Sequence, residues 1–168
     1  SNIFYELYCQ EEEKDNAEFK CCMVVNHDEQ VKVYSDIAKK LGITEKYGEV
    51  VSKASTFLNR HKDLDSVDVV FIDEAHLLFT QGNQGYSGKN QLDDIIKRAK
   101  VVVIVFDENQ ILRMDQYWEK QMIDRYRNKA IEQQNYITLT KQLRMQADNE
   151  TLAWIDAFTK KQIINKIP

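Results

Sequence analysis

Two pairs of adjacent acidic residues each follow an apolar run of the chain. Asp73 and Glu74 come directly after "VDVVFI", and Asp107 and Glu108 come directly after "AKVVVIVF". Because ligands of open α/β sheets bind beyond the carboxyl ends of the strands, acids at such positions are placed for chemistry. One acid can bind Mg²⁺ through water while its neighbour orients or deprotonates an attacking water, as in nucleotide hydrolysis. The alternative is that the acids only cap a following helix, which we favour for an isolated Asp-Glu pair.

Four β-branched runs predict the strands that position these acids. They lie at residues 19–26, 67–73, 99–107 and 136–140. The second and third are almost continuously apolar, as in parallel strands covered on both faces. Apolar residues at helical spacing predict helices marked by Val31, Tyr34, Ala38 and Leu41, by Leu92, Ile95, Ile96 and Ala99, by Trp118, Met122, Tyr126 and Ala130, and by Leu152, Ile155 and Phe158. This alternation predicts an α/β fold with a parallel sheet flanked by helices.

The composition fits one globular domain. The 168 residues include 43% hydrophobic and 30% charged residues, with one Pro and five Gly. A formal charge of -4 argues against bulk attraction to nucleic acid but leaves a local basic groove open. The three cysteines suggest neither a disulfide framework nor a metal site, which fits a reducing compartment. No apolar run reaches the roughly 18 residues of a membrane span. We therefore expect a cytoplasmic location and no membrane partner.

Three segments, in order along the chain, resemble the motifs of one family. "VDVVFIDEAH" resembles the Walker B segment, motif II, of superfamily-one helicases and related P-loop ATPases. "VVVIVFDENQIL" resembles motif III, in which an acid precedes a glutamine by three positions, here Asp107 and Gln110. "ITLTKQLRMQADNETLAWID" resembles the segment that begins with Leu139 and continues to Gln142 and Arg144. The resemblance covers most of the chain and is strongest to a family of predicted ATPases related to the helicase-like domains of Schlafen proteins.

The resemblance implies a three-layer RecA-like domain whose cofactors are Mg²⁺ and ATP. Asp73 would hold Mg²⁺ through water, and Glu74 would act on the hydrolytic water. Gln110 would sense the γ-phosphate, and Arg144 would reach it with a planar guanidinium that stabilises charge. His76 belongs to the same motif as Asp73 and Glu74, and its role would be only to order the loop. The resemblance thus implies catalytic roles for Glu74, Gln110 and Arg144, and nucleotide-binding roles for Asp73, Gln142 and Asp107.

The phosphate-binding motif of P-loop enzymes, GxxxxGK[ST], does not occur in this sequence. The nearest segment, residues 83–90, has Asn83 in place of the first Gly and Asn90 in place of the Ser or Thr, and it follows motif II. We reject it as a phosphate site. We therefore expect a truncated single domain over residues 1–168 that lacks the phosphate-loop strand, with a tag remnant at its first two residues. The resemblance then implies a sheet in which the strand at residues 19–26 is followed by those at 67–72 and 100–106, by a gap or a direct closure, and by the strand at 136–140. Such a fragment should bind ATP weakly or not at all, and its exposed strand edge invites self-association.

Two alternatives to an ATPase stay open. The four acids could hold two metal ions about 3.5–4 Å apart in a nuclease, but Gln110, Gln142 and Arg144 would then have no role. A non-catalytic interaction module on a degenerate ATPase fold could present Tyr117 and Trp118 to bases or to a partner helix. We favour core positions for Trp118 and its helical neighbours. The favoured function is a fragment of an ATP-hydrolysing, helicase-like motor that acts with single-stranded DNA or RNA and is inactive in isolation.

Overall fold

The computed structural model describes residues 2–14, 16, 18–82, 86–107, 118–139, 147–159, 162–164 and 166. The chain divides into two compact units, Ser1–Trp118 and Glu119–Pro168. The first unit contains the sheet, and the second contains helices α6 (Lys120–Glu132) and α7 (Asn149–Thr159). The single domain expected from the sequence stays a prediction. None of the helices in the described ranges is both long enough and apolar enough to span a membrane.

The sheet of the first unit has four parallel strands in the order β2-β1-β3-β4. Their bounds are Cys21–Val25 for β1, Val51–Ser52 for β2, Val67–Asp73 for β3 and Ala99–Ile104 for β4. Val25 of β1 is the partner of Asp73, and Ile72 of β3 is the partner of Ile104. The register therefore brings the carboxyl ends of β1, β3 and β4 to one edge of the sheet. Three of the four predicted strands are confirmed, in the predicted order.

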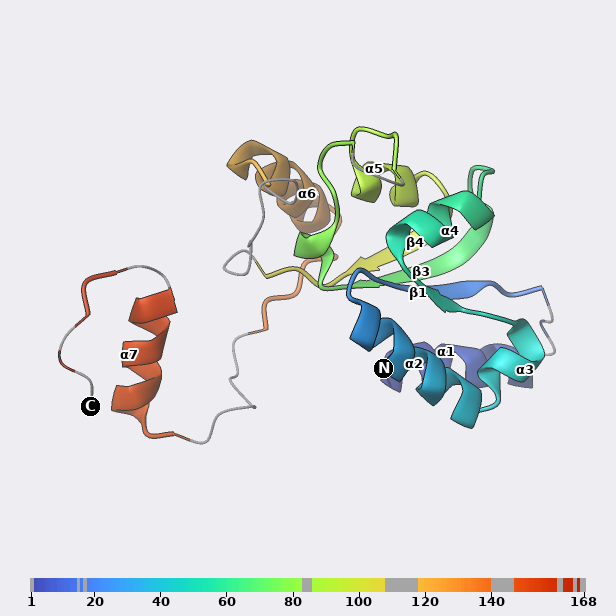
Figure 1. Cartoon of the computed structure of the whole chain (residues 1–168), viewed down its shortest axis with the longest axis horizontal. Helices are drawn as coiled ribbons and strands as arrows, with labels where there is room; N and C mark the ends of the chain where they lie inside the picture. Colours follow the sequence, from blue (N-terminus) through green and yellow to red (C-terminus); the bar gives the residue numbers. More distant parts are fainter. Residues whose placement is uncertain are drawn as a thin grey trace. The chain divides into compact units, whose positions relative to one another are not determined.

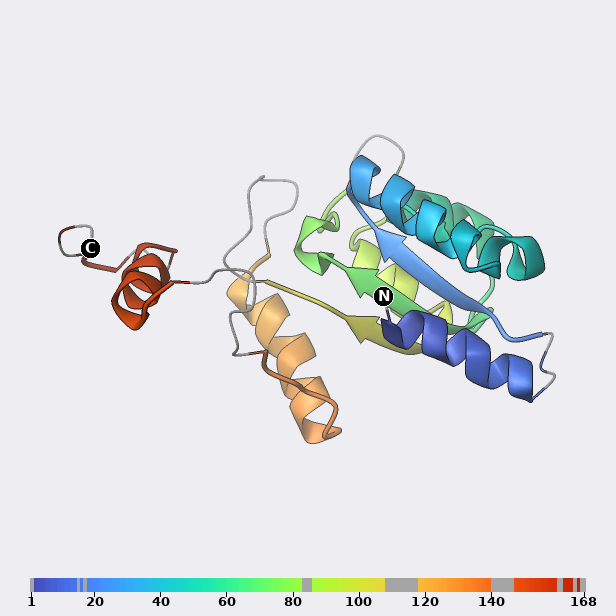
Figure 2. The ribbon, with the colours of Figure 1, turned by 90° about the horizontal axis from the view of Figure 1, so that it is seen from below.

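Helices cover both faces of this sheet (Figures 1 and 2). Figure 1 shows α1 (Asn2–Glu13), α2 (Asp28–Lys40) and α3 (Ile43–Tyr47) on one face, and α4 (Ala54–Arg60) and α5 (Gln91–Ile96) on the other. The predicted α/β fold with a parallel sheet flanked by helices is confirmed, and its three layers are consistent with the RecA-like class.

Aromatic residues of α1 anchor that helix to the sheet. Phe4 and Tyr8 lie one turn apart, so they share a face, and their rings meet edge to face at 5.2 Å between centroids. The Phe4 ring also packs edge-on against Phe71 of β3 at 5.9 Å. The buried Tyr8 hydroxyl donates a hydrogen bond to the backbone carbonyl of Cys21. Helix α1 therefore contributes its aromatic face to the core.

Asn90 has a structural role at the start of α5. Its side-chain oxygen accepts hydrogen bonds from the backbone N–H groups of Leu92 and Asp93 at 2.9 and 3.1 Å, which makes it the N-cap. A Cβ atom at Gly88 would lie only 2.2 Å from the Tyr86 hydroxyl, so the loop glycine makes room for a side chain of its own loop. These residues of the segment rejected as a phosphate site thus serve helix capping and loop packing.

The predicted strand at residues 136–140 is wrong over its described residues 136–139, which form neither strand nor helix. Ile137 and Leu139 are 82% and 84% exposed, and a β-branched run becomes a strand only where it pairs and buries a face. The sequence also missed β2, α3 and α4, whose lengths of two, five and seven residues are too short to show a period.

The predicted core positions around α6 and α7 have mixed outcomes. Trp118 is buried, as expected, but it precedes α6 and belongs to the first unit. Helix α6 buries none of its residues, so Met122 and Tyr126 are not core positions of the second unit. Helix α7, where Trp154 and Phe158 were likewise expected to pack, also buries none of its residues, and Phe158 is exposed. The two rings stack on each other, with 5.5 Å between their centroids.

Asp68 of β3 links β4 and the residue that precedes β1 at the amino edge of the sheet. Its two carboxylate oxygens accept hydrogen bonds from the Lys20 backbone N–H at 2.9 Å and from the Lys100 ammonium at 2.7 Å. Burial acts to raise the pKa of Asp68, but these two bonds outweigh it, so the pKa lies below its ordinary value. A lowered carboxyl pKa contributes stability that is present above the unfolded pKa of about 3.9 and is lost as the pH falls through the folded pKa.

Asp68→Asn should therefore lower the free energy of unfolding by about 1 kcal/mol at pH 7, because it removes a charge-assisted pair that is partly exposed. The difference from the wild type should shrink as the pH falls below about 4. Urea unfolding at a series of pH values measures this, with the exposed Asp63→Asn as the matched control. A difference that is constant with pH would contradict the assignment.

Candidate functional site

Asp73 ends the strand β3, and its carboxylate is held in a fixed orientation. Its Oδ2 accepts a hydrogen bond from the Tyr34 hydroxyl at 2.8 Å, and its Oδ1 accepts one from the Glu74 backbone N–H at 3.1 Å. The side chain is half-buried. Because each carboxylate oxygen has two acceptor positions, a further bond to each oxygen remains available for a ligand. The carboxylate can therefore bind a hydrated cation without first breaking its protein contacts.

Glu74 adopts a left-handed backbone conformation, with φ 52° and ψ 47°. For a residue other than glycine this costs about 1–2 kcal/mol. The short 3₁₀ helix η1 (Ala75–Leu77) follows directly. The Ala75 N–H donates to the Val105 carbonyl at 2.9 Å, and the Val105 N–H donates to the Ile72 carbonyl at 2.9 Å. The ladder between β3 and β4 thus continues past the strained residue and holds the turn in place.

A second contact holds the far end of this turn. The side-chain amide of Asn26, directly after β1, donates a hydrogen bond to the Leu77 carbonyl at 2.8 Å. The turn that carries Glu74 is therefore attached to both neighbours of β3. Such attachment on two sides allows a strained backbone to persist at a site.

His76 is buried, with only 2% of its surface exposed, and it lies beside the Glu74 carboxylate. Its Nε2 is 3.2 Å from Glu74 Oε2, which makes an ion pair when the ring is protonated. The His76 ring meets the Phe106 ring edge-on, and Phe106 meets Trp118 in the same way at 5.2 Å. The Trp118 indole N–H donates to the His76 carbonyl at 3.3 Å. His76 thus connects Glu74 to the two residues that flank segment 107–117.

The structure brings together only some of the residues predicted from the sequence. Asp73 and Glu74 are adjacent, and Asp107, half-buried, follows β4, whose carboxyl end lies at the same edge of the sheet. The other predicted site residues, Gln110, Gln142 and Arg144, lie outside the described residues, as do Glu108 and Tyr117.

Two polar contacts of the site were not predicted. The sequence pattern places Tyr34 on the apolar face of its helix and Asn26 at the end of a strand. Their partners lie 39 and 51 residues further along the chain, so no local pattern in the sequence signals these bonds.

The donor set fits Mg²⁺ held partly by water. Within the described ranges, no group of three or more His, Cys, Asp or Glu residues could hold a metal ion. Mg²⁺ in nucleotide enzymes commonly takes one or two carboxylates and completes its shell with waters and phosphates. Asp73, with its fixed carboxylate, matches that kind of ligand.

Cys22 and His61 form a second pair of reactive side chains, on the α4 side of β1. Cys22 Sγ lies 3.9 Å from His61 Nε2. Burial raises the pKa of the Cys22 thiol to about 11, and burial lowers the pKa of His61 below its ordinary value. Both groups are therefore uncharged at neutral pH. The pair does not supply the thiolate that nucleophilic catalysis requires.

Comparison with known proteins assigns the family. The family model described as Schlafen group 3, DNA/RNA helicase domain, matches residues 1–168. The chain belongs to this family. This Schlafen group 3 domain is also similar to the uncharacterized protein YPL245W of Saccharomyces cerevisiae, with 33% identity over 154 residues. The match covers 87% of the chain but 33% of the yeast protein, so the chain spans about a third of that relative's length. No solved structure matches this chain.

The strain at Glu74 can be measured with two substitutions that both remove its carboxylate. Glu74→Gly should give a more stable protein than Glu74→Ala by about 1 kcal/mol, because only glycine adopts positive φ without steric cost. Chemical denaturation of the two variants measures the difference in the free energy of unfolding. If the alanine variant is equally stable or more stable, the left-handed conformation is not a feature of the folded protein in solution.

Proposed function

We propose that the protein containing this domain hydrolyses ATP with Mg²⁺ at the carboxyl edge of β1, β3 and β4, and that single-stranded DNA or RNA stimulates the reaction. The observation that carries the proposal is the arrangement of Asp73 and Glu74. Two hydrogen bonds orient the first carboxylate, and a fixed turn and the buried His76 position the second. Membership of a DNA/RNA helicase domain family supports the same activity.

Each acid has a separate role in the proposal. Bound Mg²⁺ supplies charge neutralisation on the phosphates. Asp73 accepts hydrogen bonds from the water around the cation and fixes where the cation lies. Glu74 orients the attacking water and accepts its proton, a role that requires a carboxylate held within hydrogen-bonding reach of that water. The contact with His76 limits the directions in which the Glu74 carboxylate can point.

The remaining roles are carried by residues known from the sequence motifs. We propose that Gln110 senses the γ-phosphate, that Arg144 stabilises its developing charge, and that Asp107 and Gln142 contact the nucleotide. In this proposal His76 also connects Glu74 to the segment that carries Gln110, because it contacts Phe106 and Trp118 on either side of that segment.

The phosphate cradle is proposed to come from residues outside this chain. Among the described residues, β4 forms the last strand of the sheet on its side, and Val101 and Val103 are 53% and 39% exposed there. A further parallel strand that ends in a phosphate loop would pair with this edge. Without that further strand, the exposed edge of β4 can pair with the edge of a second copy, so self-association is expected.

The test is Mg²⁺-dependent ATP hydrolysis by the full-length protein, with and without single-stranded DNA or RNA, beside its Glu74→Gln variant. Glutamine keeps the size of the side chain but cannot accept the proton, so hydrolysis should fall about 10²–10⁴-fold. Glu45→Gln, at an exposed position of α3, is the matched control and should keep wild-type activity.

Two results would contradict the proposal. A folded wild-type protein that does not hydrolyse ATP would favour a non-catalytic interaction module. Metal-dependent cleavage of DNA or RNA without nucleotide would favour the two-metal nuclease.

A further inference from the structure

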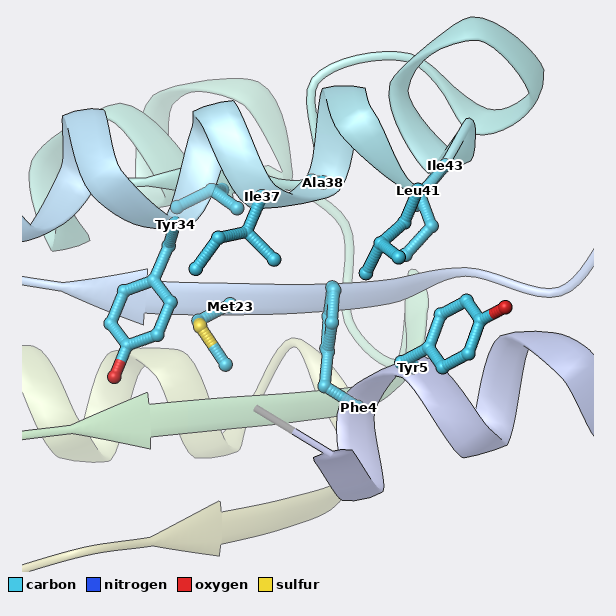
Figure 3. Close-up of a pocket in the computed structure, with 9 residues that line it drawn as sticks. Phe4, Tyr5, Met23, Tyr34, Ile37, Ala38, Leu41 and Ile43 are labelled. Carbon is cyan, nitrogen blue, oxygen red and sulfur yellow. The ribbon is translucent and has the colours of Figure 1, made fainter.

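The hydroxyl of Tyr34 joins helix α2 to the site residue Asp73. The two residues are 39 positions apart, and the hydroxyl donates to Asp73 Oδ2 at 2.8 Å. Figure 3 shows the Tyr34 ring beside β1, with its hydroxyl directed away from α2. Together with Met23 and Ile37, the ring lines an apolar slot. The cavity volume of this slot is about 20 Å³. Apolar packing thus holds the ring, while the polar end reaches the carboxyl edge of the sheet.

This bond removes a rotation that Asp73 would otherwise retain. The terminal torsion of an aspartate side chain is broad, and both oxygens turn together about it, so a second hydrogen bond narrows the range that one bond alone would leave. The bond from the Glu74 N–H is local, since it comes from the next residue in the chain. The bond from Tyr34 comes from another layer of the fold and fixes the second oxygen. Together the two bonds set the plane of the carboxylate.

A hydrogen bond from a tyrosine could also block a cation, but the acceptor count argues against this. A carboxylate has about four lone-pair positions, and the bonds from the Tyr34 hydroxyl and the Glu74 N–H occupy one on each oxygen. One position on each oxygen remains for the water shell of a cation. The hydroxyl therefore orients the carboxylate and leaves it able to bind.

We propose that Tyr34 is a positioning residue that holds the Asp73 carboxylate for Mg²⁺. This inference rests on the proposed function, because it assigns to Tyr34 a share in the metal affinity of that same site. Residues that hydrogen-bond a metal ligand typically change metal affinity or activity by about 10–100-fold when they are replaced. Tyr34 acts through Asp73, so its loss should weaken metal binding more than it slows turnover at saturating metal.

The experiment compares Tyr34→Phe with Tyr5→Phe in the full-length protein. Phenylalanine keeps the ring that packs in the slot and removes only the hydroxyl. Tyr5 lines the same slot from α1, and Figure 3 shows it away from the Tyr34 end, so it is the matched control. Hydrolysis at saturating ATP gives the half-saturating concentration of free Mg²⁺ and kcat. Electron paramagnetic resonance of Mn²⁺ measures metal binding without turnover, and thermal unfolding checks that each variant is folded.

The expected result is a half-saturating Mg²⁺ concentration about tenfold higher in Tyr34→Phe, a matching loss of Mn²⁺ affinity, and a kcat within about twofold of the wild type. Tyr5→Phe should match the wild type in all three quantities. Unchanged metal dependence in Tyr34→Phe, or an equal change in Tyr5→Phe, would overturn the positioning role while leaving the hydrolysis proposal intact. Tighter metal binding in Tyr34→Phe would show that the hydroxyl blocks the site. A wild type with no Mg²⁺-dependent hydrolysis and no Mn²⁺ binding would instead remove the proposed function, and the inference with it.

Discussion

The pairing of β3 with a strand on each side is the constraint on which the site depends. Parallel neighbours place the carboxyl ends of β1 and β4 beside that of β3, so residues that follow these strands share one edge. The β3–β4 ladder continues through Val105 after the last residue of β4, and Asn26 holds the turn from the β1 side. The hydrogen bonds of Val105 and Asn26 offset the free-energy cost of placing Glu74 in a left-handed conformation. The adjacent Asp73 and Glu74 carboxylates are held by different contacts.

The two carboxylates have different partners, one from another layer of the fold and one from the same turn. Tyr34 reaches Asp73 from α2, whereas His76 lies within the turn and reaches Glu74. Hydrogen bonds from different elements restrict a side chain more than bonds from its own turn, because each element is held independently by the core. The chain belongs to the Schlafen group 3 helicase domain family, and the proposed function gives each of the two acids a separate task.

Much of the fold could be predicted from the sequence because burial leaves a periodic record. The nearly continuous apolar run at residues 67–73 predicted a strand with the observed bounds, and the acids at its end predicted the edge at which a site would lie. The run at 136–140 shows the limit of that reasoning, since β-branched composition does not reveal whether a neighbouring strand is present to pair with it. The finer features of the site leave no local record. The backbone of Glu74 has a conformation typical of glycine or asparagine, and the Tyr34 contact joins residues far apart in the chain.

The central claim is that Mg²⁺ and nucleotide bind at the carboxyl edge of the sheet, and paramagnetic broadening of amide resonances tests it most directly. The measurement uses isotopically labelled full-length protein with Mn²⁺ and ATP, and it compares the amides of Glu74 and Ala75 with those of Lys20 and Lys100. The last two residues lie near the opposite edge, roughly 20 Å away along a strand of this length. The account predicts that Mn²⁺ with ATP broadens the first pair strongly and leaves the second pair sharp. Broadening at Lys20 and Lys100, or sharp Glu74 and Ala75 resonances with ATP bound, would contradict it.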